Sequence, residues 1–423
     1  MSNEISIADY MDGFASTARN AARAMAMAPT NQKNAALEKA AALIRSRADQ
    51  ILAVNGEELA AARKSGLENA FIDRMALDAS RIESIAQALE DIAALADPVG
   101  QSIRKWKRPN GLEIERVRTP IGVIAIIYES RPNVTVDAAA IGVKAGNAVI
   151  LRGGSDCIRT SKTLFDLFHQ AVCEAGLPGG AVQFVETTDR AAVGALLCGL
   201  DGRIDLVIPR GGKSLVARVH SEARVPVLSH LDGVCHVYVD RDADLERAVN
   251  IAVNSKMRRT GVCGAAETLL IDAAILDRAW PPIAVALRDA GCELRVDEKI
   301  HAIDPNAARA TEDDFYAEFL APIISVAAVD GVAGAIAHIA RYSSNHTDSI
   351  VTENDETASR FLNEVDSAIV MHNASTQFAD GGEFGLGAEI GIATGRLHAR
   401  GPAGVEELTT YKNIVRGAGQ TRP

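Results

Sequence analysis

The chain has 423 residues, 48% of them hydrophobic and 23% charged, which is the composition of an ordinary globular protein with roughly two or three domains. Its formal net charge is −11 and no block of five or more Lys or Arg residues occurs, which argues against nucleic acid or an anionic membrane as a partner. Its six cysteines include no CxxC pair and no Cys/His metal-ligand spacing, so we expect reduced thiols, no metal and a cytoplasmic location.

The N-terminal part of the chain is rich in alanine and has helical periodicity. The start MSNEISIADYMD carries acidic residues and no apolar core, so we do not expect a signal peptide. No stretch reaches about 18 consecutive apolar residues, and no membrane span is predicted. Apolar residues recur every three to four positions over 36–66, which predicts helical structure ending at Gly66.

The periodicity changes after residue 110. GLEIERVRT (111–119) alternates apolar and polar residues like an exposed strand, Pro120 interrupts, and IGVIAIIY (121–128) reads as a buried strand. Short apolar strands then alternate with helical stretches, first at AVIL, VQFVE, DLVI and HVYV, then at TLLI, APIISVAAV, DSIVT and SAIVM. This rhythm predicts two βα series with parallel sheets, a boundary near 229–240, and a C-terminal strand at LTTYKNIVR with an exposed edge.

Two segments of the first series have residues suited to a ligand. In YESRPNVTVDAAAIGVKAGNAVILRGG (128–154), the Asn133 amide could stabilise an oxyanion, although an Asn at this point is also a common helix N-cap. Arg152 and Ser155 follow a buried strand, where open α/β sheets bind ligands, and an Arg there suits a nucleotide phosphate or is a solvated surface charge.

DLVIPRGGKS (205–214) reads as a strand, a glycine-rich turn and a helix start. Backbone N–H groups at such a start favour phosphate, which points to Gly211, Gly212 and Lys213. The run matches neither GxGxxG nor GxxxxGKS, and a tight turn explains the glycines equally well. His230 follows in HLDGVCHVYVD (230–240), where a histidine could act near neutral pH or lie hydrogen-bonded in the core.

Cys263 has the most informative surroundings in the sequence. It lies in NSKMRRTGVCGAAETLL (254–270), where Lys256, Arg258 and Arg259 precede it and glycines flank it. An isolated cysteine is usually buried and unreactive. Nearby positive charge, however, lowers a thiol pKa and produces the nucleophilic thiolate, so this setting favours a reactive cysteine.

Taken in order, these segments resemble the aldehyde dehydrogenase superfamily and, within it, the gamma-glutamyl phosphate reductase family. The most specific segments are YESRPNVTVDAAAIGVKAGNAVILRGG, IPRGGKSL, VLSHLDGVCHVYVD and the tail FGLGAEIGIATGRLHARGPAGVEELTTYKNIVRG. The similarity covers nearly the whole chain. Arg258, Arg259, Thr260 and Gly264 depart from the reductase pattern around the cysteine.

The resemblance implies an α/β aldehyde-dehydrogenase-like fold. A Rossmann-like NADP-binding domain is expected over 1–105 and 122–231, and an α/β catalytic domain over 232–392. Residues 106–121 and 393–423 are expected to form a β oligomerisation element of a homo-oligomer.

The resemblance also assigns roles to single residues. It makes Cys263 the nucleophile, and Asn133 with the Cys263 N–H the oxyanion hole. The residues that it places at NADP(H) are Arg152, Ser155, Gly211, Gly212, Lys213 and Glu318, and the small Ser155 favours NADP over NAD. His230 stands where hydrolytic aldehyde dehydrogenases carry a general-base glutamate. The candidates for binding the substrate phosphate are Arg131, Lys256, Arg258, Arg259 and Arg400.

The reaction implied is the NADPH-dependent reduction of L-glutamyl 5-phosphate to L-glutamate 5-semialdehyde, through a thioacyl intermediate on Cys263, in proline biosynthesis. A glutamate 5-kinase that supplies the acyl phosphate is a candidate partner. Two alternatives remain open at this point: an ordinary NAD(P) aldehyde dehydrogenase that forms the free acid, and a non-catalytic NADP-binding protein.

Overall fold

The computed structural model describes residues 6–422, and its contacts divide the chain into two compact units. Unit 1 contains the chain up to Ser229, Gly385–Gly391 and the segment from Ala403 onward. Unit 2 contains His230–Phe384 and Ile392–Pro402. The functional domains expected from the sequence stay predictions; in the structure, residues 106–121 belong to unit 1, and the tail beyond 392 is shared between both units.

Unit 1 begins with a group of helices that the alanine-rich sequence predicts. They are α1 (Ile7–Met25), α2 (Thr30–Ser46), α3 (Ala48–Lys64), α4 (Asn69–Met75) and α5 (Ala79–Ala94). The periodic run 36–66 is not one helix, because the backbone leaves the helical region at Arg47, where φ is −112° and ψ is 17°. The predicted end at Gly66 holds: this glycine has a φ of +79°, the left-handed conformation that commonly follows a helix.

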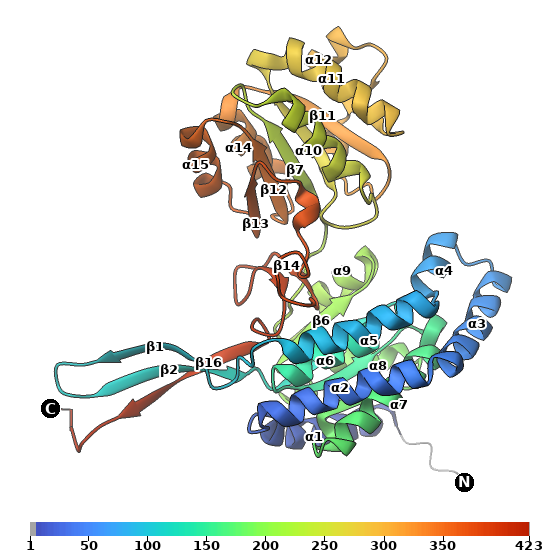
Figure 1. Ribbon diagram of the computed structural model, residues 1–423, viewed down its shortest axis with the longest axis vertical. Helices are drawn as coiled ribbons and strands as arrows, with labels where there is room; N and C mark the ends of the chain where they lie inside the picture. The colour runs from blue at the N-terminus through green and yellow to red at the C-terminus, as the bar shows by residue number, and fades with distance from the viewer. Residues whose placement is uncertain (1–5, 423) are drawn as a thin grey trace. The chain divides into compact units, whose positions relative to one another are not determined.

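A parallel four-stranded sheet forms the centre of unit 1 (Figure 1). Its strand order is β5-β4-β3-β6, and the strands are β3 (Val123–Tyr128), β4 (Ala148–Arg152), β5 (Val182–Phe184) and β6 (Leu206–Arg210). The helices of this series are α6 (Val134–Lys144), α7 (Ile158–Glu174), α8 (Arg190–Leu197) and α9 (Lys213–Glu222). Since the strands are parallel, the segments that follow β3, β4 and β6 emerge at the same edge of the sheet.

A separate antiparallel ribbon of three strands completes unit 1. It consists of β1 (Ser102–Lys107), β2 (Glu113–Pro120) and β16 (Thr409–Arg416), with β2 in the middle. Figure 1 shows β16 lying beside β2, with Thr409 opposite Pro120 and Arg416 opposite Glu113. Pro120 is thus the last residue of β2, where a missing backbone N–H is tolerated.

Unit 2 contains a parallel seven-stranded sheet of order β10-β9-β11-β8-β7-β12-β13. Its strands are β7 (Cys235–Val239), β8 (Ala266–Asp272), β9 (Glu293–Val296), β10 (Ala308–Arg309), β11 (Ile323–Val329), β12 (Thr347–Val351) and β13 (Ile369–His372). Its helices are α10 (Leu245–Met257), α11 (Leu276–Asp289), α12 (Glu298–Ile303), α13 (Glu312–Phe315), α14 (Gly331–Tyr342) and α15 (Asp355–Glu364). Two short strands, β14 (Gly391–Ala393) and β15 (Gly401–Ala403), pair with each other in the tail.

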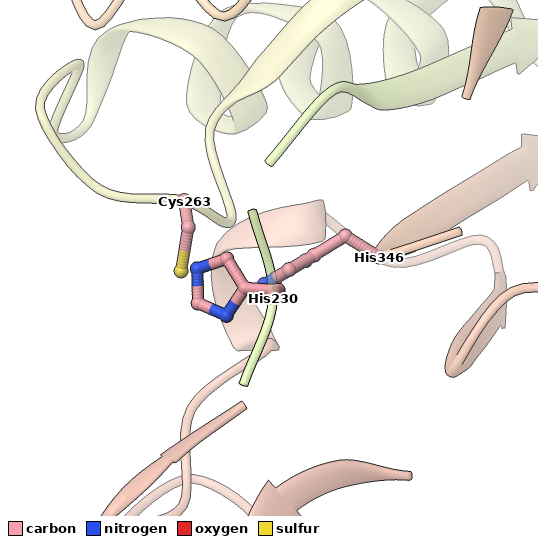
Figure 2. A group of neighbouring side chains, drawn as sticks. All are labelled: His230, Cys263 and His346. Atoms are coloured by element: carbon pink, nitrogen blue, oxygen red, sulfur yellow. The ribbon is translucent and has the colours of Figure 1, made fainter. Parts of the chain in front are cut away.

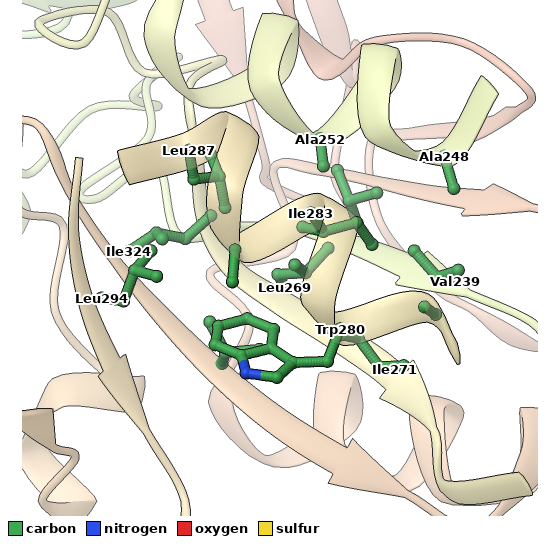
Figure 3. Packing of buried hydrophobic residues seen from close by; sticks show 14 of the residues in the cluster. Val239, Ala248, Ala252, Leu269, Ile271, Trp280, Ile283, Leu287, Leu294 and Ile324 are labelled. Atoms are coloured by element: carbon green, nitrogen blue, oxygen red, sulfur yellow. The ribbon is translucent and has the colours of Figure 1, made fainter. Parts of the chain in front are cut away.

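The core of unit 2 fixes the ends of α10 and β8, between which Cys263 lies. Figure 3 shows Trp280, Ile283 and Leu287 of α11 packed with Leu269 and Ile271 of β8. All five side chains are essentially inaccessible to solvent, and the Trp280 Nε1–H donates to Asp304 Oδ2 at 3.0 Å. Among the helices of residues 6–422, none has both the length and the apolar character needed to cross a membrane.

Candidate active site

Cys263 lies in the turn between α10 and β8 of unit 2, and its side chain is half-buried. The backbone of Gly233 runs so close that a Cβ added there would lie 2.4 Å from the Cys263 carbonyl oxygen and 2.7 Å from its Cα. The Cys235 thiol donates to that carbonyl oxygen at 3.1 Å. The segment that leads into β7 therefore packs directly against the Cys263 turn. The close approach at position 233 leaves no room for a Cβ, so only Gly fits there.

Two histidines accompany the Cys263 thiol. The ligand atoms of His230, Cys263 and His346 all lie within 4.8 Å of one another, and Figure 2 shows the sulfur beside the His230 ring. His230 Nδ1 lies 2.7 Å from the Ile392 carbonyl oxygen, and the His230 and His346 rings meet edge to face with centroids 4.9 Å apart. Burial lowers the pKa of His346 to about 3, so this imidazole is neutral near pH 7.

His236, the other histidine of the HLDGVCHVYVD segment, has a structural role. Its Nδ1 lies 2.8 Å from Asp348 Oδ1, and that carboxylate also accepts from the His236 backbone N–H at 3.0 Å. Both side chains are completely buried. His236 is therefore a hydrogen-bonded core histidine.

The basic run before Cys263 divides into a buried and an exposed part. Lys256 is completely buried and forms an ion pair with the equally buried Glu267, so its charge is compensated within unit 2. Burial raises the pKa of Glu267 despite the opposing charge of Lys256. Arg258 and Arg259 lie beyond the end of α10 with exposed side chains, and the Arg259 carbonyl oxygen accepts from Gln377 Nε2 at 3.2 Å.

The remaining phosphate candidates lie in different units. Arg400 of unit 2 donates from Nη1 to Asp366 Oδ1 at 2.7 Å and from Nη2 to the Asp366 carbonyl oxygen at 2.9 Å. Arg131 of unit 1 is half-buried just before α6, and its carbonyl oxygen accepts from the Val134 N–H at 3.1 Å. Arg400 is thus engaged with a carboxylate of its own unit.

Asn133 stands at the N-terminus of α6 without capping the helix through its side chain. Its Nδ2 instead donates to Asp137 Oδ2, one helical turn later, at 2.9 Å. Desolvation raises the pKa of Asp137 to about 6, against the opposing effects of the Asn133 hydrogen bond and the Arg210 charge. Asp137 thereby fixes the orientation of the amide. Asn133 belongs to unit 1 and Cys263 to unit 2, so their pairing as an oxyanion hole stays a prediction.

Two of the predicted cofactor segments, after β4 and after β6, emerge at the carboxyl edge of the unit 1 sheet. Arg152, the last residue of β4, donates to the carbonyl oxygens of Gly153 at 2.8 Å and Thr188 at 3.1 Å, while its buried Nε has no hydrogen-bond partner among residues 6–422. Ser155 is exposed, and its Oγ lies 3.4 Å from Asp156 Oδ1. The other oxygen of Asp156 accepts from Ser130 Oγ at 3.1 Å.

Gly211, Gly212 and Lys213 form the predicted helix start after β6, and α9 begins at Lys213. The Gly212 N–H donates to Glu129 Oε2 at 2.8 Å, and a Cβ at position 211 would lie 2.5 Å from that oxygen. A carboxylate therefore occupies the N-terminus of α9. Such a position suits a carboxylate, because the N–H groups and the dipole of a helix start favour negative charge; its role in binding phosphate stays a prediction.

Glu318 lies half-buried in the unit 2 loop between α13 and β11. Leu320 in this loop has a φ of +52°, and its N–H lies 3.3 Å from Glu267 Oε1. The Glu267 carboxylate thus joins the Glu318 loop to Lys256 at the end of α10. Glu267 and Leu320 are 53 residues apart in the sequence, so a distant strand residue holds this loop.

Sequence reasoning missed several residues that the structure brings to these segments. They are Glu129, Asp137, Cys235, Glu267 and His346. Asp137 was detectable from its position four residues after Asn133 on a predicted helix. His346 stands in a polar loop sequence, SSNHTDS, that carries no local indication of a cysteine nearby.

The sequence matches the Aldehyde dehydrogenase family over residues 6–302. A gamma-glutamyl phosphate reductase of Parvibaculum lavamentivorans is 60% identical over 413 residues, which cover 98% of this chain and 97% of the relative. One from Caulobacter vibrioides is also 60% identical over 413 residues, covering 98% of this chain and all of the relative.

Solved structures agree. The crystal structure of a gamma-glutamyl phosphate reductase from Thermotoga maritima superimposes with a TM-score of 0.95 at 44% identity, covering 98% of this chain and 100% of that one. An acetylating aldehyde dehydrogenase from Geobacillus thermoglucosidasius, 18% identical, shares the fold with a TM-score of 0.69 over 99% of this chain and 98% of its own. The predicted fold class is therefore confirmed, and the chain belongs to the aldehyde dehydrogenase family and, within it, to the gamma-glutamyl phosphate reductases.

Proposed function

We propose that this protein is an oxidoreductase that reduces L-glutamyl 5-phosphate to L-glutamate 5-semialdehyde with release of phosphate, using NADPH, in proline biosynthesis. The observation that carries the proposal is the half-buried Cys263, held in a tight turn beside exposed arginines, in a chain 60% identical to reductases that carry this name. None of the six cysteines, all within the described residues, forms a disulfide, which suits a reaction in the reducing cytoplasm.

The residues at the carboxyl edge of the unit 1 sheet suit NADP(H). The Arg152 Nε, which has no partner among the described residues, and the Gly212 N–H, which donates to the Glu129 carboxylate in this structure, are donors of the kind that phosphate groups require. We assign the ribose end to Arg152 and Ser155, the pyrophosphate to the helix start at Gly211, Gly212 and Lys213, and the nicotinamide ribose to Glu318. When bound, the cofactor supplies the hydride.

Cys263 supplies the nucleophile in this proposal. Its thiolate attacks the acyl carbon, the C–O bond to phosphate breaks, and a thioester between Cys263 and the glutamyl group remains. After reduction, the thiohemiacetal oxyanion is stabilised by the Asn133 amide, which Asp137 orients, and by the Cys263 N–H. Collapse of this species releases the aldehyde and restores the thiolate, so one difficult displacement becomes two easier steps.

The environment of Cys263 suits reduction better than hydrolysis of the thioester. His230 stands where the resemblance places the general-base glutamate of hydrolytic relatives. Its Nδ1 faces the Ile392 carbonyl oxygen at 2.7 Å, a contact in which the ring nitrogen must donate. At this position a water molecule near the thioester meets a histidine in place of the carboxylate base, whereas the acyl phosphate of the substrate releases phosphate, a good leaving group, without a base.

The phosphate that leaves requires cations near Cys263. Arg258 and Arg259 are the stronger candidates, because their side chains are exposed while Lys256 is neutralised by Glu267 and Arg400 by Asp366. Arginine also binds phosphate in a bidentate manner. Arg131 joins this set only if the two units bring it to the cysteine.

The proposal includes assembly. The ribbon of β1, β2 and β16 carries exposed apolar side chains, Ile103, Tyr411 and Val415, which suits contact with a second copy in a homo-oligomer. The unstable acyl phosphate also makes a glutamate 5-kinase a fitting partner.

The reverse reaction tests the proposed function. With glutamate 5-semialdehyde and NADP, the protein should reduce NADP only when inorganic phosphate or arsenate is present, because the thioester needs an acceptor other than water. NADP reduction is followed while the phosphate concentration is lowered to zero. Sustained turnover without phosphate, with free glutamate as product, would identify an ordinary aldehyde dehydrogenase instead.

A further inference from the structure

The cluster around the Cys263 thiol contains two imidazoles that the proposed reduction does not use chemically. His230 enters it from the start of unit 2, Cys263 from the turn before β8, and His346 from the residue before β12 (Figure 2). One ligand atom of each residue lies within 4.8 Å of the others. Thiolate and imidazole are the ligands that Zn²⁺ prefers, and three protein ligands are the usual number in zinc sites with an open position.

The orientation of both rings suits a metal. His230 Nδ1 faces the Ile392 carbonyl oxygen, which fixes the tautomer with the lone pair on Nε2. Hydrogen bonding of the distal ring nitrogen to a backbone carbonyl is the usual way in which a metal-binding histidine is oriented. His346 Nδ1 lies 2.9 Å from Thr347 Oγ1 and 3.5 Å from Cys235 Sγ, so this ring is also held through one nitrogen.

The second ring nitrogen of His346 is available to a ligand. Its side chain is completely buried, and its Nε2 has no hydrogen-bond partner among the described residues. Buried ring nitrogens are normally satisfied, and an unsatisfied one calls for a ligand or an ion. The Nε2 atoms of His236 and His338 also have no partner among the described residues. Of these three histidines, His346 is the one whose ligand atom lies within 4.8 Å of those of a cysteine and a second histidine.

We propose that His230, Cys263 and His346 form a binding site for Zn²⁺ that blocks the thiol. Zn–N bonds of about 2.0–2.1 Å and a Zn–S bond of about 2.3 Å require the three ligand atoms to approach one another by roughly 1 Å. Binding deprotonates the thiol, the proton passes to solvent, and water completes the tetrahedral coordination. Inhibition by Zn²⁺ rests on the proposed role of Cys263 as nucleophile, whereas binding does not.

Absorption spectra of the full chain with Co²⁺ test the site without reference to turnover. The chelator-treated protein is titrated with CoCl₂, and we expect one equivalent to produce a sulfur-to-cobalt charge-transfer band that Zn²⁺ removes. Cys263→Ser should lose the band, and His346→Gln should weaken Co²⁺ binding at least tenfold. The matched control is His169→Gln, which removes a half-buried histidine 3.9 Å from the exposed Cys173 and should leave the titration unchanged.

Alkylation of the thiol provides a second measurement. Zn²⁺ should slow iodoacetamide labelling of Cys263 at least tenfold and leave Cys173 unaffected, and this protection should disappear in His346→Gln. NADPH binding and the thermal midpoint confirm that the variants fold; should His346→Gln fail, His230→Gln replaces it. Absence of the charge-transfer band, or Zn²⁺ protection that survives in the folded histidine variant, would overturn the site. If Zn²⁺ binds but alkylation of Cys263 leaves reductase activity intact, the metal site stands and the proposed function fails.

Discussion

At the scale of single residues, the proposed chemistry depends on one of six cysteines, Cys263. Cys263→Ala should reduce turnover on the order of 10³-fold or more, because no other group supplies the covalent step. NADPH binding should survive, since the residues proposed to contact the phosphate groups of the cofactor lie in unit 1. Cys173→Ala, which alters an exposed thiol on α7, is the control and should keep near-normal activity. Substantial turnover in Cys263→Ala, measured with kinase-generated glutamyl phosphate, would exclude a covalent mechanism.

Ser155 is the residue on which the predicted preference for NADPH depends. Ser155→Glu places a second carboxylate next to that of Asp156, which already lies 3.4 Å from the Ser155 hydroxyl. Repulsion of the 2′-phosphate should weaken the binding of NADPH more than that of NADH. The difference between the two binding free energies should change by about 1–3 kcal/mol. Dissociation constants for both cofactors, with Ser155→Ala as the uncharged control, measure this effect. An unchanged ratio would show that Ser155 does not face the ribose.

Asp137 should give the chain a pH-dependent stability. Its pKa in the folded chain is about 6, against a usual value of 3.8, so the folded state holds this proton more tightly than the unfolded state. Its contribution to the free energy of unfolding is complete below about pH 4 and is lost as the pH rises through about 6. As the pH rises from 4 to 7, the free energy of unfolding of Asp137→Asn should therefore increase relative to that of wild type by on the order of 1–3 kcal/mol. Urea unfolding across this range measures the difference, and a constant difference would contradict the assignment.

At the scale of elements, the close approach of two backbone segments controls the Cys263 turn. Gly233→Ala forces a Cβ to within 2.4–2.8 Å of Cys263 atoms, so the turn or the start of β7 must shift. We expect a loss of about 1–3 kcal/mol in stability and a lower turnover number. Gly261→Ala is the matched control, because a Cβ there meets nothing within 4 Å. Thermal unfolding and turnover are measured for both variants. If Gly233→Ala is as stable and as active as Gly261→Ala, the close approach of Gly233 to Cys263 is not required.

The elements that the sequence predicts well are those with a strong local pattern. Strand β3 is a continuous apolar run and is buried at every position, as the run IGVIAIIY predicts. The short strands β9 and β10 are not predictable in this way: β9 alternates exposed and buried residues over only four positions, and β10 has two exposed residues. Strands β9 and β10 form because they pair with neighbouring strands of the sheet. A local sequence pattern carries no information about those neighbours. The break at Arg47 likewise interrupts a continuous helical periodicity.

The candidate site shows the same limit. Cys263 and its basic flank are adjacent in sequence, so the pattern alone identifies them. Several contacts around these residues join segments far apart in the chain: Glu267 meets the loop of Leu320, and His346 approaches His230. The pairing of Lys256 with Glu267 also removes a cation that the sequence offered as a phosphate ligand. Burial decides which charges remain available, and burial depends on the complete fold.

At the scale of the whole molecule, assembly should depend on the three-stranded ribbon. Tyr411 and Val415 of β16 are about half exposed and, four residues apart in a strand, lie on the same face. Val415→Lys places a charge in this face and should shift the protein to smaller species in light scattering. Lys412→Glu, which changes the charge of a neighbouring exposed residue, is the control. NADPH binding should persist in both variants. If the mass of Val415→Lys in light scattering is unchanged, the ribbon does not mediate assembly.

The pairing of β16 with β2 also governs the order in which the chain is built. Unit 1 contains both the first described helix and the last strand, and the Asn147 amide donates to the Leu408 carbonyl oxygen 261 residues later. At about 5–20 residues per second, ribosomes need roughly tens of seconds to translate the intervening segment. Most of unit 2 is one continuous segment that leaves the ribosome before β16. During translation, the part synthesised first is therefore the part completed last, and its central strand β2 waits with one edge unpaired until the tail is released.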